Sequence, residues 1–589
     1  MKTRLLAMPV ILILILTLFV SACGSNVDDY YADSSYLDTI NNEDIANVLE
    51  SEPVTLLEAD YAKFPILHIN SYYDPFAQLR DSWLDGTLSL SGVYENMTFE
   101  DVDVRVRGRG HSTWWRGPDK RPLRIRFSEA RPVLSDYPAR DWILLADHFD
   151  RSLLRNYAAL TLGSKLCGLS FTPVPHHVQL YVNDEYMGVY LLTDERNVGP
   201  GRMDLYWDED PATSDYFFEK DVRAYQRRIL DESFIIVNGL QYNLRYPNDL
   251  TSEHVDYIRT YIEAVSYAIR YQSFDEILTL IDLGSFIDFY IVQELFKDKD
   301  AKHTSIFMYI TGINDERRLF KGPIWDYDHS AGNAPNQPMG YGPVGIYVAE
   351  INYWYRYLLQ RPEFFEAVQI RWNDVKDNQI AETIEHVRQI AIHYQDEFER
   401  NFDRHLIMGI PSGVPATAEI LEIENFMGHV EHLLSWLTTR ANWLDDYFNN
   451  RVDYDPMAVV FEHFINSPIS IVKNDELHVF DTAGPIRLVN IIVAPINELA
   501  DIFDANFSYD DTSNTLELSK QDVVITQQVG DTIVYVNGQS FDMGMPSSLF
   551  IQEHLYFCLM LTISAFGYEV IWNDFTETIY IVDSRMQIG

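Results

Sequence analysis

Apolar and polar residues alternate in several short stretches of the first third of the chain, as they do in half-buried β-strands. The alternation is clearest in Val102–Arg107 and in Leu123–Phe127. A further hairpin is expected across Val178–Leu192, with its turn at Asn183-Asp184, because Asn and Asp tolerate the left-handed backbone that such turns require. This part of the chain therefore predicts an antiparallel sheet.

Helical periodicity first appears at residues 151–166, where Asp150 is a good N-cap, and it dominates from about residue 252 onward. Tyr257–Tyr271 and Gly284–Lys297 have apolar residues at helical spacing, and a longer helical block rich in Trp, Phe, Tyr and Leu covers 351–449. A β-rich first part followed by a helical second part predicts an α+β fold.

The end of the chain contains an internal repeat. Phe503–Leu518 aligns with Phe566–Ile581, and each copy predicts an apolar helix, a strand, an Asn/Asp turn and a second strand. Tyr535–Gln539 adds another hairpin turn. The module, which begins near residue 468, resembles the copper amine oxidase N-terminal-like domain of bacterial surface proteins, and the resemblance implies a stalk or adhesion role. His554 stands alone, so no copper site is expected.

The first residues have the pattern of an export signal. A short basic start is followed by the almost unbroken apolar stretch Leu5–Val20, which is short for a bilayer span. The small residues before Cys23 resemble a bacterial lipoprotein processing site, which implies a signal peptide over 1–22 and a lipid on Cys23. The polar, acidic residues 23–61 then predict a tether. We therefore expect an extracytoplasmic protein anchored to the bacterial cell membrane by lipid.

Composition narrows the function classes. A chain of 589 residues is too long to fold around one hydrophobic core, so two or three domains are expected. With 47% hydrophobic residues the chain is globular, and its formal net charge of −43 argues against nucleic acid as a partner. Cys167 and Cys558 fall in different predicted domains, so we expect buried thiols and no disulfide framework.

One basic segment stands out against this acidic background. Arg105–Arg126 combines glycines, a Ser-Thr pair at Ser112 and a dense run of Arg and Lys. Glycines at a hairpin tip let backbone N–H groups approach an anion, and the basic side chains on the flanking strands neutralise phosphate charge. The alternative is a solvated edge hairpin that is basic to prevent aggregation. Glu195 closes a later strand and is a candidate partner for a phosphate-binding base.

Carboxylates at two places have the spacing of a phosphoryl-transfer site. Asp298 and Asp300 follow an apolar helix, and the five residues from Asp300 to Ser305 favour Asp300 as the leading carboxylate. About two dozen residues later, Asp326 and Asp328 lie on one side of a short extended segment, where two carboxylates can bind Mg²⁺ or Mn²⁺.

Six motifs follow one another along the chain: Arg107–Trp114, Lys120–Phe127, Trp142–Ala146 with Asp150 and Leu154–Asn156, Gly188–Tyr190, Asp300 with Ser305, and Trp325–Asp328. Together these motifs resemble the spore-coat protein H (CotH) family of kinase-like proteins over roughly residues 62–450. The chain departs from the family by having Arg121 and Arg126 where Lys is usual.

The resemblance implies an atypical protein-kinase fold with a β-rich N-lobe and a helical C-lobe, which binds ATP and a divalent cation. On that resemblance Asp300 takes the place of the catalytic carboxylate. The resemblance implies metal ligands at Asp326, Asp328 and Ser305, and cofactor-binding residues at Lys120, Arg124, Arg126, Ser112 and Glu195.

The resulting expectation is a lipid-anchored extracytoplasmic kinase that phosphorylates Ser or Thr of secreted or surface proteins. Its expected organisation is a signal peptide (1–22), a tether (23–61), a kinase-like domain (62–450), a linker (451–467) and a C-terminal module (468–589), the last a candidate for contact with the cell wall. One alternative is a non-catalytic surface binding protein on a kinase-like scaffold. A weaker alternative is a hydrolase that uses Asp300 and Asp326 as a carboxylate pair, although it leaves the basic segment unexplained.

Overall fold

The computed structural model describes residues 64–583 apart from short gaps, the longest of which are 222–233, 334–341, 411–417 and 451–468. The expected signal peptide, Cys23, the tether and the linker lie outside the described residues. Two compact units divide the chain near residue 456, and each is described by itself. None of the helices in the described part combines the length and apolarity needed to cross a bilayer.

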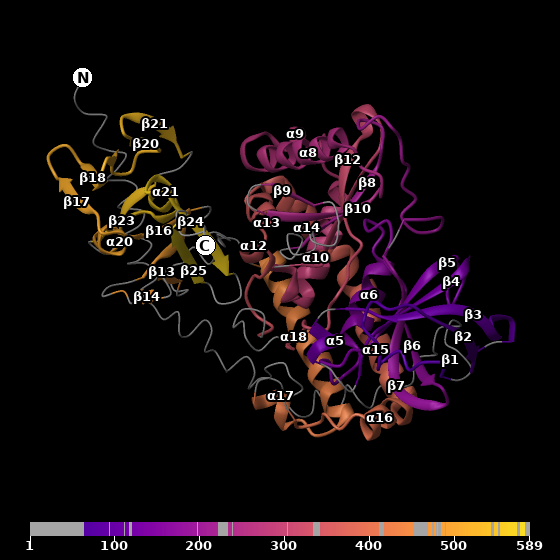
Figure 1. Ribbon diagram of the computed structural model, residues 1–589. Coiled ribbons are helices and arrows are strands. Elements are labelled where there is room, and N and C mark those ends of the chain that lie inside the picture. Colours follow the sequence, from indigo (N-terminus) through magenta and orange to yellow (C-terminus); the bar gives the residue numbers. More distant parts are fainter. Residues whose placement is uncertain are drawn as a thin grey trace. The chain divides into compact units, whose positions relative to one another are not determined.

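The first unit opens with a closed seven-stranded barrel (Figure 1). Apolar side chains of alternate residues fill its interior, Val104 and Val106 on β3 among them, while Arg105 and Arg107 between and beyond them face outward. The strand order is β1 (Ile66–Ser71), β2 (Leu84–Ser91), β3 (Phe99–Gly108), β4 (Leu123–Arg131), β5 (Ala139–Leu145), β7 (Glu185–Asp194) and β6 (His176–Val182).

The hairpin turn expected at Asn183-Asp184 is confirmed, since both residues have positive φ, 49° and 63°. The helix expected over 151–166 starts later than predicted, at Arg155. Its N-cap position is Leu154, and α6 (Arg155–Lys165) follows. Asp150 instead closes the preceding turn, accepting hydrogen bonds from the backbone N–H groups of Ser152 and Arg155.

A second, five-stranded sheet follows the barrel, and of its strands the sequence pattern predicts only the apolar run Ile306–Ile310 after Ser305. The strand order is β12 (Arg318–Lys321), β11 (Ile306–Thr311), β8 (Tyr216–Lys220), β10 (Leu240–Tyr246) and β9 (Phe234–Val237). Every neighbouring pair is antiparallel.

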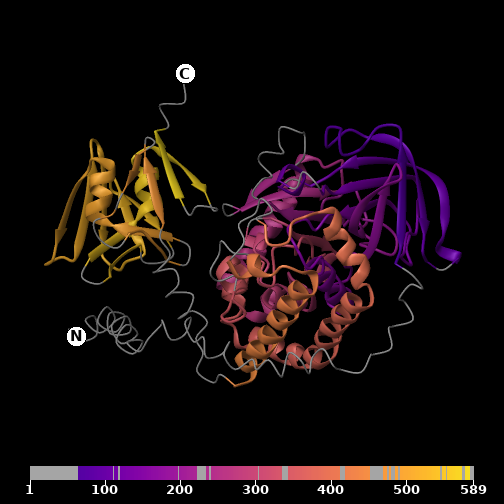
Figure 2. The same ribbon diagram turned by 90° about the horizontal axis from the view of Figure 1, so that it is seen from below.

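Helices make up the rest of the first unit, and both views show them gathered on one side of the barrel (Figures 1 and 2). Helix α10 (Leu283–Phe296) is at their centre, buried on all sides from Ser285 to its end. The others are α8 (Ser252–Tyr271), α9 (Phe274–Leu278), α12 (Val348–Ile351), α13 (Tyr353–Leu358), α14 (Pro362–Val375), α15 (Ala381–His393), α16 (Gln395–Arg404), α17 (Ala418–Glu422) and α18 (Phe426–Asn450); the short α5 (Ser112–Arg116) lies between β3 and β4.

The C-terminal unit has the repeat expected from the sequence. Helix α20 (Ile496–Phe503) leads into β17 (Asn506–Asp510) and β18 (Thr515–Lys520), and α21 (Leu559–Ala565) leads in the same way into β24 (Tyr568–Asn573) and β25 (Thr578–Asp583). The remaining strands are β13 (Ser470–Lys473), β14 (Glu476–His478), β15 (Ile486–Leu488), β16 (Ile491–Pro495), β19 (Val523–Gln528), β20 (Ile533–Val536), β21 (Gln539–Asp542), β22 (Ser548–Ile551) and β23 (His554–Cys558).

Cysteine placement differs in part from the expectation. Cys558 is buried, as predicted, but Cys167 is exposed and accepts a hydrogen bond from Arg371 Nη2 at 3.4 Å. Cys167 lies just beyond the C-terminal end of α6, where its side chain is exposed.

Lys321, at the end of β12, is a buried cation in an aromatic cage. Its side chain is 1% exposed, and Nζ lies 4.6 Å from the centre of the Trp354 ring and 5.3 Å from that of Phe286. Its hydrogen-bond acceptor is the thioether sulfur of Met308, a weak one. Burial, and then the nearby charge of Lys220, lower the pKa of Lys321 well below 10.5.

We predict that Lys321→Met raises the free energy of unfolding by about 1 kcal/mol near neutral pH, because it removes a desolvated amine without a strong acceptor. The native pKa is lowered, so the unfolded state binds a proton that the native state does not, and wild-type stability falls as pH falls from 10.5. The advantage of the variant should therefore be larger near pH 7 than near pH 10. Denaturant unfolding at both pH values measures this difference. Lys165→Met, which removes a surface ion pair, is the control. A variant less stable than wild type at both pH values would contradict the prediction.

Candidate active site

The two carboxylate segments of the sequence lie side by side in the structure. One follows α10 and contains Asp298 and Asp300; the other follows β12 and contains Asp326 and Asp328. Backbone hydrogen bonds join them: Lys299 N–H donates to the carbonyl of His329 at 3.2 Å, and Ala331 N–H donates to that of Phe296 at 2.7 Å. These hydrogen bonds bring the two motifs, which are far apart in the sequence, together in one site.

Asp298 and Asp300 have different surroundings. The Asp298 carboxylate is 1% exposed and accepts hydrogen bonds from the backbone N–H groups of Asp300, at 3.1 Å, and Ala301, at 3.0 Å. It thus caps the 3-10 turn Asp300–Lys302, which Lys220 Nζ also holds by donating to the Lys302 carbonyl at 2.7 Å. Asp300 is partly exposed at the start of this turn. Of the two carboxylates, Asp300 is the one that solvent reaches.

Ser305 and Asp326 meet directly. Ser305 Oγ donates a hydrogen bond to Asp326 Oδ2 at 3.1 Å. Both residues have a left-handed backbone, with φ of 63° and 74°, a conformation that costs a residue other than glycine about 1–3 kcal/mol. Two such residues in contact indicate that the surrounding structure holds these side chains in place at the expense of local backbone energy.

Burial and mutual repulsion raise the pKa values of the carboxylates. For Asp298 and Asp328 burial is the main cause, and neighbouring carboxylates add to it. For Asp326 burial and Asp300 raise the pKa, while Arg109 and Arg196 oppose the shift. Burial and repulsion thus disfavour the charged forms of these carboxyl groups in the carboxylate corner, made of Asp298, Asp300, Asp326 and Asp328, and a bound cation would favour those forms.

Arg109 and Arg196 are the cations facing Asp326, and the sequence reading did not single them out. Their guanidinium carbons lie 5.8 Å and 4.4 Å from the centre of the Trp325 ring. Burial lowers the pKa of Arg196 to about 10, although Glu219 and Glu195 oppose the shift. Arg109 lies within the motif Arg107–Trp114 and Arg196 follows Glu195, yet nothing in the local sequence says which basic residues face the carboxylates.

Glu195 pairs with a base, as its position at a strand end suggested. Arg124 Nη2 lies 2.7 Å from Glu195 Oε2 and its Nε lies 3.1 Å from Asp141 Oδ1. Arg126, two residues along the same strand, shares the Asp141 carboxylate: its Nε is 2.6 Å from Asp141 Oδ1, and its guanidinium also stacks on Trp83. Of these two arginines, Arg124 pairs with Glu195. Among the described residues, Arg126 has no ion pair with the carboxylate corner.

Lys120 is fully inside the protein. It is 1% exposed, and its Nζ has no hydrogen-bond partner among the described residues. Burial lowers the pKa of Lys120 to about 7, and the charges of Asp147 and Asp150 oppose that shift. Burial likewise raises the pKa of Asp147 to about 8. Lys120 therefore belongs with Asp147 and Asp150, at the side of the site next to Asp328. The side chain of Ser112 lies outside the described residues.

The glycines of the basic segment have a packing role. A Cβ on Gly108 would lie 2.3 Å from the Trp114 ring, so glycine is required for this tryptophan to reach the barrel core. Gly110 has a φ of 76°, and its carbonyl accepts a hydrogen bond from Arg80 Nη1 at 3.0 Å. These contacts explain both glycines without an anion.

The start of α6 fixes the segment that carries Asp326 and Asp328. Asn156 Nδ2 donates to Asp147 Oδ1 at 2.7 Å, and Asn156 Oδ1 accepts from the backbone N–H of Tyr327 at 2.6 Å. Arg155 pairs with Asp150 at 2.6 Å and donates to the carbonyls after Asp328, at Ser330 and Ala331. Two adjacent residues therefore connect the barrel side to the metal-ligand candidates.

The carboxylates of this site offer a metal ion few protein ligands. Among the residues that the structure describes, no group of three or more His, Cys, Asp or Glu is arranged to hold a metal ion. Magnesium in kinase sites uses one or two carboxylates together with substrate phosphates and water rather than an all-protein cage. Asp326 and Asp328, both with raised pKa values, fit that smaller requirement.

Comparison with known families gave two matches. The model of the family described as CotH kinase protein matches residues 104–444, and that of the copper amine oxidase N-terminal domain matches residues 472–581. No curated protein matches the chain. The first match contains all the active-site residues described above, and the second lies within the C-terminal unit.

We predict that Asn156→Ala lowers the free energy of unfolding by about 2–3 kcal/mol, because it leaves the Tyr327 N–H and Asp147 without their buried partner. Chemical denaturation measures the loss. Thr438→Ala, which removes a helical side-chain-to-backbone hydrogen bond, is a control for a dispensable contact. Equal effects of the two substitutions would contradict the special position of Asn156.

Proposed function

The chain belongs to the CotH kinase protein family, and from this premise we propose that it transfers the γ-phosphate of ATP to a Ser or Thr hydroxyl of a secreted or surface protein. The observation that carries the proposal is the meeting of Asp300, Ser305 and Asp326 at a buried corner faced by two arginines. Phosphoryl transfer needs positioning and electrostatic stabilisation more than covalent help from the protein, and this corner supplies both.

Asp300 orients the attacking hydroxyl and accepts its proton as the hydroxyl oxygen bonds to the γ-phosphorus, whose bond to the bridging oxygen of ADP breaks and releases ADP. It suits this role because it is accessible while Asp298 is committed to backbone N–H groups. Asp326 and Asp328 hold Mg²⁺ or Mn²⁺, and Ser305 keeps the Asp326 carboxylate oriented. A cation held there with the nucleotide would neutralise phosphate charge.

The basic side chains divide into groups by their contacts. Arg109 and Arg196 face Asp326 and therefore stabilise phosphate oxygens next to the cation. The Arg124–Glu195 pair resembles the base–glutamate pair of kinases in its chemistry. It holds the Arg124 guanidinium in a fixed position, where its charge acts on Arg109. Lys120 offsets the negative charges of Asp147 and Asp150 and does not contact the phosphates directly.

The cellular setting is also part of the proposal. We place the protein outside the cytoplasm, attached to the cell membrane through a lipid on Cys23. The C-terminal module, matched to the copper amine oxidase N-terminal domain, serves as a surface or cell-wall contact. The net charge of −43 suits a solvated extracellular surface and disfavours nucleic acid partners.

We predict that Asp300→Asn lowers the rate of phosphate transfer by about 10²–10⁴-fold, the usual contribution of a positioned base. Transfer of labelled phosphate from ATP with Mg²⁺ or Mn²⁺ to a generic protein substrate, and to the protein itself, measures the rate. Asp315→Asn, an exposed aspartate in the turn between β11 and β12, is the matched control and should retain full activity. Absence of transfer by the wild type under both cations, with no nucleotide binding, would favour the non-catalytic binding protein.

We predict opposite effects of Asp326→Asn on the free and the nucleotide-bound protein. Removing one of several repelling buried carboxylates should leave the free protein at least as stable as wild type. ATP with Mn²⁺ at a hundredfold excess over Kd stabilises a folded protein by about 2.7 kcal/mol, and the variant should lose this stabilisation. Thermal unfolding with and without ATP and Mn²⁺ measures both. A variant that is destabilised when free, yet still stabilised by nucleotide, would overturn the assignment of Asp326.

A further inference from the structure

The outer face of the barrel presents four arginines as two directly opposed pairs. Arg105 on β3 lies opposite Arg126 on β4, and Arg107 lies opposite Arg124. Like charges directly across two antiparallel strands destabilise a sheet, since their Cβ atoms are only about 4.5–5.5 Å apart. Such an arrangement in a protein with a net charge of −43 calls for a ligand or a set of counter-charges.

Counter-charges account for three of the four arginines. Arg107 pairs with Asp81 at 2.9 Å, Arg124 pairs with Glu195, and Arg126 pairs with Asp141. Arg105 has no carboxylate partner among the described residues. Its contact is with Trp83, whose ring centre lies 5.1 Å from the guanidinium carbon, and Arg107 and Arg126 approach the same ring at 5.0 Å and 4.7 Å. Trp83 therefore holds three guanidinium groups together.

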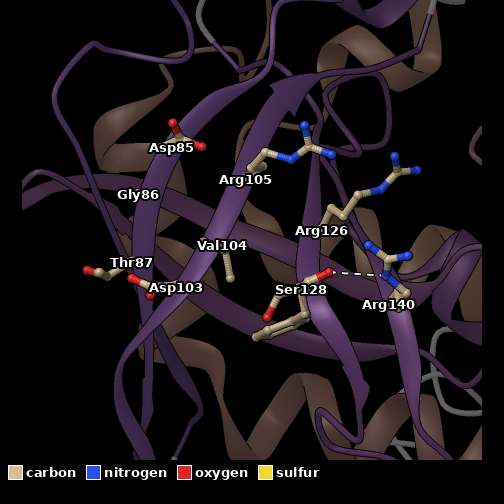
Figure 3. A pocket seen from close by; sticks show the side chains of 10 residues that line it. Asp85, Gly86, Thr87, Asp103, Val104, Arg105, Arg126, Ser128 and Arg140 are labelled. Carbon is tan, nitrogen blue, oxygen red and sulfur yellow. Dashed lines mark hydrogen bonds between the residues drawn. The ribbon is translucent and has the colours of Figure 1, made fainter.

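A groove of about 590 Å³ opens beside Arg105. Figure 3 shows the side chains of Arg105, Arg126 and Arg140 extending from neighbouring strands to one side of the groove. Asp85, Thr87 and Asp103 line the other side. Asp85 is the cross-strand neighbour of Arg105, yet the Arg105 side chain extends away from it, toward Arg126 (Figure 3).

We propose that this groove binds a phosphate monoester on an extended peptide, that is, a phosphorylated segment of a protein substrate. The guanidinium of Arg105 supplies an unpaired fork of donors, which suits the bidentate recognition of phosphate. The carboxylates of Asp85 and Asp103 repel a polyanion, so a single phosphate group fits better than a triphosphate or a nucleic acid. An open sheet surface accepts an extended chain.

The groove is a site separate from the carboxylate corner. Arg126, which the sequence assigned to the nucleotide, has its contacts here with Asp141 and Trp83. The proposal rests on the proposed function in one respect, the origin of the phosphorylated segment. A kinase that retains its product by such a groove holds neighbouring hydroxyls at a high effective concentration near Asp300, and this favours several phosphorylations of one chain.

The test is binding of a fluorescent peptide that contains one phosphoserine, measured by anisotropy on the full protein without ATP or metal. Matched peptides contain Ser or Asp at that position. We expect the phosphoserine peptide to bind about tenfold or more tightly than either, and Arg105→Ser to remove that preference. Arg259→Ser, which breaks an exposed ion pair on α8, is the control and should leave the preference unchanged. Because Arg105 is exposed, its substitution should leave the fold intact.

Three outcomes would overturn the proposal. Equal binding of the Ser and phosphoserine peptides would exclude a phosphate site, and equal binding of the Asp and phosphoserine peptides would indicate charge attraction alone. Competition by ATP with Mn²⁺, or loss of binding in Asp326→Asn, would place the phosphate in the transfer site instead. Retained phosphopeptide binding by Asp300→Asn separates this proposal from the proposed function, because binding does not need transfer.

Discussion

Several carboxylates share one buried corner of this protein, and the rest of the first unit is arranged around that electrostatic constraint. Asp298 is stabilised by backbone N–H groups, Asp326 by the Ser305 hydroxyl and two arginines, and Asp150 by Arg155. The stabilising groups come from several elements: Arg109 and Arg196 follow β3 and β7, Arg155 lies on α6, Asp300 and Ala301 follow α10, and Ser305 precedes β11. The barrel, the second sheet and the central helix must therefore all be in place for the corner to exist. Burial and neighbouring carboxylates nevertheless raise the pKa values of Asp298 and Asp328, so a cation bound beside them would favour their charged forms.

Local sequence signals predicted elements whose pairing is local. The barrel strands around Val104, the Asn183-Asp184 turn and the C-terminal repeat are confirmed, and the α+β class with them. The second sheet was largely missed because β8 lies between β10 and β11, so its pairing joins residues some 25 to 90 positions apart (Phe218 with Leu244 and with Met308) that no periodicity connects. Asp150 was expected to cap a helix, but its carboxylate closes a turn instead, because it accepts hydrogen bonds from the backbone N–H and the guanidinium of Arg155, five residues on.

The candidate site was predictable to a similar extent. Spacing and resemblance selected Asp300, Ser305 and Asp326, and the structure brings these together, although their roles stay predictions. Arg109, Arg196 and Asp147 were not selected, because their importance comes from stacking on Trp325 and from burial next to Lys120. Arg124 and Arg126 both bind Asp141, but Arg124 alone also pairs with Glu195, a difference that alternation does not show. A run of basic residues shows that charge is needed but not where each charge is used.

The hydrogen bonds from α6 to the segment around Tyr327 restrict how the first unit can move. Asn156 and Arg155 join the chain leaving the barrel to the backbone on both sides of Asp328 through short, buried hydrogen bonds. A hinge motion between α6 and this backbone would have to break several of these hydrogen bonds at once. It would leave buried polar groups without partners, which costs free energy. The barrel and the central helices therefore move as one body here. Access to the carboxylate corner must depend on smaller movements of side chains and loops on its open side, such as rotation of the arginines that cover Trp325.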